Sequence, residues 1–99
     1  MIELETIKEL KDYEMLASFK QRAFFGKDVY HYLYKGLFNN VHISYCDFGI
    51  KTSWVASYGV GDTEETFLDK GIIYNGYSKF DAIEKTKDIL GRAKEYKND

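Results

Sequence analysis

Proline is absent from this 99-residue chain, and cysteine occurs only once. Cys46 cannot form an internal disulfide, which agrees with a reducing compartment, so we expect a cytoplasmic protein. No apolar run approaches the roughly 18 residues that a membrane span needs, and Met1-Ile2-Glu3-Leu4-Glu5 is too acidic for a secretory signal. We therefore expect neither a membrane span nor export.

Arginine and histidine are also scarce. Arg22 and Arg92 are the only arginines, and the net charge is −2, which argues against a dedicated nucleic-acid binder. Two histidines and one cysteine argue against a structural zinc site, and no residues are arranged as a catalytic site. We expect no metal, no other cofactor and no enzymatic activity.

Lysine, isoleucine, asparagine, tyrosine and phenylalanine are abundant, a usage that favours an AT-rich genome. A low-GC bacterium, or one of its phages or mobile elements, is the expected source. The chain has the length of one domain, 1–99, and its 44% hydrophobic and 30% charged residues are typical of a globular protein.

Residues 29–48 predict a β-hairpin, because both halves are rich in aromatic and β-branched residues around Asn39-Asn40. A two-residue turn there sets His31 opposite Phe48 and His42 opposite Leu37. The two histidines would then be ~20 Å apart and share neither a metal nor a catalytic dyad. One face of the hairpin carries the residues that we expect in the core: Tyr30, Tyr32, Tyr34, Phe38, Val41, Ile43 and Tyr45.

A helix is predicted over residues 4–25. Thr6 and Glu9 form a T-x-x-E capping box, and apolar residues recur behind it at helical spacing. The apolar stripe drifts, so the helix could break, with Asp12 capping a second segment that ends at Gly26.

A third strand is predicted over residues 52–58, with Trp54, Ala56 and Tyr58 on one side. Residues 66–68 and 72–74 are possible short strands, separated by the turn residues 69–71. Residues 78–97 predict an amphipathic helix, capped by Ser78 with Asp81 three residues later. The expected architecture is α+β: an N-terminal helix, an antiparallel meander of three to five strands, and a C-terminal amphipathic helix packed on one sheet face.

The order of helix, three strands and helix, with Gly76-Tyr77-Ser78-Lys79 opening the last helix, resembles the double-stranded-RNA-binding domain. That family places a lysine cluster at the start of the last helix. In this chain Lys79 is followed by Phe80, Asp81 and Ala82, so the resemblance covers topology and few residues.

The leading hypothesis is a non-enzymatic module that binds a partner protein through an open, tyrosine-rich sheet face and the acidic residues 61–69. If a mobile element encodes the protein, such a module would suit the role of an inhibitor of a host defence protein. The basic groove with which a defence protein binds nucleic acid attracts carboxylates. The expected binding residues are Asp62, Glu64, Glu65, Asp69, Tyr58, Tyr74 and Tyr77. The three tyrosines lie near predicted turns, where we expect partial exposure. A homodimer through an edge strand or the open face is compatible with this reading.

The alternative is a nucleic-acid-binding domain that uses basic residues of the last helix. Its candidate residues are Lys79, Lys85, Lys87, Arg92 and Lys94. A solvated helix face explains these side chains equally well.

Overall fold

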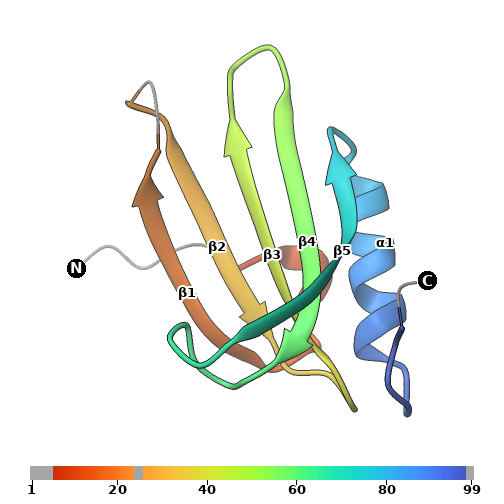
Figure 1. The fold of residues 1–99 in the computed structure, drawn as a ribbon. Coiled ribbons are helices and arrows are strands. Elements are labelled where there is room, and N and C mark those ends of the chain that lie inside the picture. Colours follow the sequence, from red (N-terminus) through yellow and green to blue (C-terminus); the bar gives the residue numbers. More distant parts are fainter. Residues whose placement is uncertain (1–5, 24–25, 98–99) are drawn as a thin grey trace.

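The computed structural model describes residues 6–23 and 26–97. It is an α+β domain in which five antiparallel strands follow one another across a single sheet, and one helix follows the last strand (Figure 1). The strands are β1 (Met15–Arg22), β2 (Asp28–Tyr34), β3 (Asn40–Asp47), β4 (Thr52–Val60) and β5 (Leu68–Gly76). The helix is α1 (Lys79–Leu90), and a short 3₁₀ turn, η1 (Lys8–Leu10), precedes β1. The α+β class and the antiparallel meander are thus confirmed.

The tyrosine-rich face of the sheet is the core. Tyr32, Tyr34 and Trp54 are almost fully buried on it, and α1 packs against β3, β4 and β5. Alternation along each strand puts these large rings on one side, where they bury apolar area against the helix. The prediction for this face is confirmed except at Phe38, which is exposed in a loop. The helix contributes Ala82, Ile83, Ile89 and Leu90.

The predicted N-terminal helix over residues 4–25 is wrong, although residues 4–5 and 24–25 lie outside the described residues. Ile7 precedes η1 with no side-chain cap, so the predicted capping box of Thr6 and Glu9 does not form. Leu10 is fully buried, and residues 15–22 pair with β2 as an edge strand. Pairing with a neighbouring strand outweighs the weak helical spacing, because long-range hydrogen bonds and burial override local propensity.

The predicted two-residue turn at Asn39-Asn40 is also wrong. Tyr34 pairs with Val41, so a longer loop, residues 35–39, joins β2 to β3. The loop is held against the helix, because the Leu37 amide donates to the carbonyl of Leu90 at 3.0 Å. The register differs from the predicted one by four residues. This even number leaves the side chains of β2 and β3 on their predicted faces but changes the cross-strand partner of each residue.

The last strand is longer than predicted and the last helix is shorter. Residues 69–71, predicted as a turn, lie inside β5, whose pairing with β4 has two irregularities. Ser78 caps α1 as predicted, accepting from the Asp81 amide at 3.1 Å, but the helix ends before Gly91 and does not reach residue 97. Among the described residues, a 3₁₀ turn and five strands precede α1, so the order of helix, three strands and helix that resembles the double-stranded-RNA-binding domain is not found there.

Candidate functional site

The sheet has a second face, which points away from α1. Cross-strand rows on it run through Phe19, His31, Ser44 and Val55, and through Gln21, Val29, Cys46 and Ser53. No helix of the part of the chain that the structure describes packs on these rows. We call this surface the open face. It is less aromatic than predicted, because the tyrosine-rich side is the one that the helix covers.

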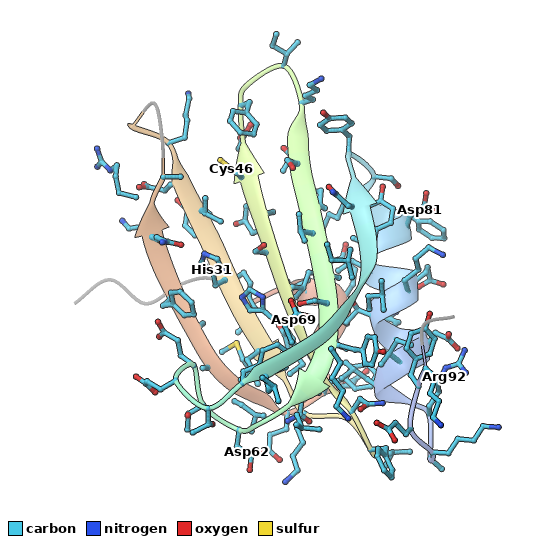
Figure 2. The ribbon with its side chains drawn as sticks, viewed as in Figure 1. His31, Cys46, Asp62, Asp69, Asp81 and Arg92 are labelled. Atoms are coloured by element: carbon cyan, nitrogen blue, oxygen red, sulfur yellow. The ribbon has the colours of Figure 1, made fainter. Side chains whose placement is uncertain are left out.

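A histidine pair lies on the open face. His31 on β2 and His42 on β3 are diagonal neighbours, and His31 Nδ1 is 2.9 Å from His42 Nε2. Gln21 Oε1 lies 3.0 Å from His31 Nε2 and so orients the first ring. The predicted separation of ~20 Å was wrong because it rested on the two-residue turn. Figure 2 shows His31 and Cys46 on the same side of the sheet.

Four rings form a row across this face. Phe19 stacks on His31 with centroids 4.4 Å apart, and His31 stacks on His42 at 5.0 Å. Phe67, from the connection between β4 and β5, lies tilted 6.0 Å beyond His42. The row therefore joins β1, β2, β3 and the β4–β5 connection.

Both imidazoles are neutral at neutral pH. Burial and, to a smaller extent, the neighbouring His42 together lower the pKa of His31 from 6.5 to about 4. Burial also lowers the pKa of His42, while the nearby Asp69 carboxylate acts in the opposite direction. Within the described ranges, no three His, Cys, Asp or Glu side chains gather in a way that could hold a metal ion. The pair thus offers neutral hydrogen-bonding groups in a partly apolar setting.

The acidic connection between β4 and β5 folds over one edge of the open face (Figure 1). Glu64 and Phe67 enclose a hollow of about 200 Å³ with β1, β2 and β3. Its other lining residues are Ala17, Phe19, His31, Leu33 and His42. We call it the histidine hollow. Asn40 fixes the connection, since its Nδ2 donates to the carbonyl of Gly61 at 2.9 Å and to Asp62 Oδ1 at 3.3 Å.

A second hollow of about 350 Å³ lies further along the open face. Apolar side chains dominate its lining, and Phe48 at its rim is 45% exposed. Its lining residues are Ala23, Val29, Ser44, Tyr45, Cys46, Phe48, Ser53 and Val55. We call it the apolar hollow. Cys46, a buried free cysteine, is one of these lining residues.

The predicted protein-binding residues fall into different places. Asp62, Glu64 and Glu65 are exposed in the β4–β5 connection, and Asp69 is exposed on β5. Figure 2 shows Asp69 near the middle of the molecule and Asp62 at its lower edge.

The three tyrosines differ in exposure. Tyr58 is only 5% exposed in the core, so its predicted exposure was wrong. Tyr74 is half-buried, and its hydroxyl accepts from the Ser78 amide. Tyr77 is exposed as predicted, with Lys51 Nζ 4.2 Å from its ring centroid.

The basic residues of the alternative do not lie on one helix. Arg92 and Lys94 follow the end of α1, whereas Lys79, Lys85 and Lys87 lie on it. Three of the five are in ion pairs: Lys79 with Glu9, Lys87 with Glu84, and Arg92 with Asp88. A helix face with alternating charges is typical of a solvated surface.

A third, polar hollow of about 520 Å³ brings Tyr77 and Lys79 together beside the start of α1. Lys8 and Trp54 also line it, and Tyr45 stacks on Trp54 with centroids 4.7 Å apart. The remaining lining residues are Thr6, Ile7, Tyr32, Asp47 and Thr52. Aromatic rings beside lysines are the groups that hold nucleobases and phosphates.

Sequence reasoning missed Phe19, Phe67 and Val55 as site residues. Phe19 could have been found from the alternation of Ala17, Phe19 and Gln21. This alternation indicates a strand once residues 15–22 are no longer assigned to a helix. No local signal places Phe67 over His42, because that contact depends on the path of the β4–β5 connection.

No family model, curated protein or solved structure matches this chain. No helix in the described ranges is both long enough and apolar enough to cross a membrane. The geometry above is therefore the basis for a functional proposal.

Proposed function

We propose that the protein is a non-enzymatic module that binds a partner protein on its open face. The observation that carries the proposal is the pair of hollows on this face, about 350 and 200 Å³, on the side of the sheet opposite α1. Apolar hollows beside exposed aromatic side chains are where partner proteins place their anchoring residues. Phe48 and Val55 are two of the apolar residues that line the larger hollow.

The acidic connection supports a partner with a basic surface. Residues 61–69 contain Asp62, Glu64, Glu65 and Asp69 and no basic residue, and all four carboxylates are on exposed residues. Such a patch speeds association with a basic partner and selects against acidic ones. An inhibitor of a nucleic-acid-binding host protein, encoded by a phage or mobile element, is the specific form of this proposal that the composition favours.

The experiment compares two apolar-to-lysine variants in affinity capture from lysate of the source organism or its host, with nuclease present. Val55→Lys alters the apolar hollow, whereas Phe80→Lys is the matched control on α1, where Phe80 is 72% exposed. We expect a stoichiometric protein that the wild type and Phe80→Lys retain and Val55→Lys loses. Circular dichroism checks that all three chains are folded. Retention by Val55→Lys, or loss only in Phe80→Lys, would contradict docking on the open face.

Nucleic-acid binding at the polar hollow is the second candidate, and the juxtaposition of Tyr77, Lys8 and Lys79 favours it. Fluorescence anisotropy with single-stranded and duplex oligonucleotides tests it at two salt concentrations. Binding through phosphates weakens steeply with salt and would be reduced by Lys79→Glu but not by Lys85→Glu. Equal effects of the two variants would indicate general electrostatics and remove the polar hollow as a site.

A further inference from the structure

We infer that the histidine hollow receives an arginine side chain of the partner protein. The inference rests on the proposed function and specifies the chemistry of one contact. An occupant must match three properties of this hollow: its ring walls, its charge and its hydrogen-bonding groups.

The walls of the hollow suit a side chain with an apolar stem and a flat end. Phe19 and Phe67 lie at the two ends of the ring row, and Leu33 and Ala17 complete the apolar lining. The stem of an arginine would contact Leu33 and Ala17, and its planar guanidinium would stack on a ring face. A hollow of about 200 Å³ holds one such side chain and not a larger segment.

The charge of the hollow favours a cation. Glu64 is the one charged residue among the lining residues that the structure describes, and no lysine or arginine is among them. Asp69 lies close enough to His42 to act on its pKa, so a second carboxylate contributes to the local potential. Burial lowers the pKa of both histidines, which leaves the floor of the hollow uncharged near neutral pH.

The hydrogen-bonding groups of the hollow also favour an arginine. Gln21 Oε1 accepts from His31 Nε2, so His31 Nδ1 carries a lone pair and accepts from His42 Nε2. This tautomer assignment follows from the orientation of the Gln21 carboxamide. The other nitrogen of His42, Nδ1, is then an acceptor as well. An acceptor on the floor and a carboxylate at the rim match a donor-only group.

Arginine fits better than lysine for two physical reasons. Its guanidinium stacks on aromatic faces and forms paired hydrogen bonds with a carboxylate such as that of Glu64. A lysine ammonium is more strongly hydrated and loses more on entering a half-apolar hollow. An apolar side chain in the hollow would leave the Glu64 carboxylate without a partner, and the carboxylate would contribute no binding energy.

The test is a titration of the full chain, followed by ¹H–¹⁵N NMR, with three blocked amino acids: N-acetyl-arginine methylamide and its citrulline and lysine counterparts. Citrulline has the shape of arginine without its charge. We expect saturable shifts at Ala17, Leu33 and Phe67 with the arginine probe. We expect binding roughly tenfold weaker with citrulline, since a charge-assisted hydrogen bond is lost.

Two matched glutamates supply the controls. Glu64→Gln should weaken binding of the arginine probe by roughly tenfold, whereas Glu84→Gln, at an exposed position on α1 outside the lining, should leave it unchanged. Equal binding of citrulline, equal effects of the two variants, or no saturable shifts at these residues would overturn the inference. A lysine probe that binds as tightly as arginine would also overturn it.

The outcomes separate this inference from the proposed function. Partner capture that is lost in Val55→Lys but unchanged in Glu64→Gln would retain docking on the open face and reject the arginine contact. Arginine binding that passes every control, with partner capture unaffected by Val55→Lys, would retain the histidine hollow as an arginine-binding site and reject its occupation by a partner protein docked on the open face.

Discussion

His31 Nδ1 lies 2.9 Å from His42 Nε2, a ring-to-ring hydrogen bond between two strands. A neutral imidazole has one N–H and one lone pair, so the bond forms only when at least one ring is uncharged. When both rings are protonated, each presents only donors and the two positive charges repel. The pair therefore couples the stability of the sheet to pH.

We expect the free energy of unfolding to decrease as the pH falls from about 7 to 5. The folded-state pKa of His31 is about 4, below the ordinary value of 6.5, and that of His42 is lowered too. The unfolded chain thus binds protons in a range where the folded chain does not. The stabilisation is complete above about pH 6.5 and is lost as the pH falls toward 4. The free energy of unfolding falls by at most about 1.4 kcal/mol per pH unit for each ring, and the partial exposure of the rings reduces this value. Urea unfolding at several pH values measures it.

A double variant, His31→Gln with His42→Gln, is the control. Its stability should change little between pH 7 and 5, because the carboxyl groups whose pKa is lowered, Glu9 and Glu95, titrate below this range. An unchanged pH dependence in the double variant would show that other groups are responsible.

The faces of the sheet could be predicted from the sequence, but the contacts across it could not. Alternation places Tyr32, Ile43 and Trp54 on one side in every register that differs by an even number of residues, and burial confirms this. The partner of each residue depends on the loop between β2 and β3, and that loop is fixed by a helix about fifty residues later through Leu37 and Leu90. The histidine pair was therefore missed, whereas the core was found.

The two capping patterns, one near each end of the chain, show when a local sequence pattern predicts a helix correctly. Ser78 and Asp81 mark the start of α1 correctly, because a capping bond is formed by neighbouring residues. Thr6 and Glu9 show the same pattern, yet the next residues form a 3₁₀ turn and an edge strand. The pairing of β1 with the edge of β2, and the burial of Leu10 in the core, outweighed the capping box. Neither can be recognised from a short stretch of sequence.

Ser78→Ala should reduce the stability by about 1 kcal/mol, the usual cost of removing an N-cap. The Ser78 hydroxyl accepts from the Asp81 amide, and alanine leaves that amide without this acceptor. Thermal or urea unfolding measures the loss. Ser78→Asp should keep most of the stability, because aspartate also caps; a loss as large as that of alanine would show that the hydroxyl acts elsewhere.

Gly36→Ala should destabilise the fold by about 1–3 kcal/mol, as overpacking does. A Cβ at this position would meet the Asn39 carbonyl oxygen at 2.1 Å and the Leu90 Cα at 3.1 Å, and both are backbone atoms that cannot rotate away. Gly91→Ala is the matched control, since a Cβ there finds its nearest neighbour at 3.4 Å. We expect the control to change the stability by less than about 0.5 kcal/mol. Equal effects in urea unfolding would contradict the close approach of the β2–β3 loop to α1.

Asn39 and Asn40 are adjacent, and both are buried, yet we expect substitutions at them to have opposite effects. Asn40 Oδ1 accepts from the Gly36 amide at 3.1 Å, and its Nδ2 donates to Gly61 and Asp62, so it joins two loops. Asn40→Ala should cost about 1–3 kcal/mol, because it leaves the part-buried backbone groups of Gly36 and Gly61 without these partners. It should also shift the NMR signals of Glu64 and Phe67, since Asn40 holds the connection that carries them.

Asn39 presents the reverse case. Its side-chain oxygen and nitrogen are buried, and neither has a hydrogen-bond partner among the described residues. Leucine has the same branching and the same number of side-chain heavy atoms as asparagine but no polar atoms, so Asn39→Leu removes the cost of dehydrating the amide without opening a cavity. We expect the free energy of unfolding to be unchanged or higher by about 1 kcal/mol in urea unfolding. A loss comparable to that of Asn40→Ala would mean that the Asn39 amide is hydrogen-bonded in solution, and that the β2–β3 loop depends on both asparagines.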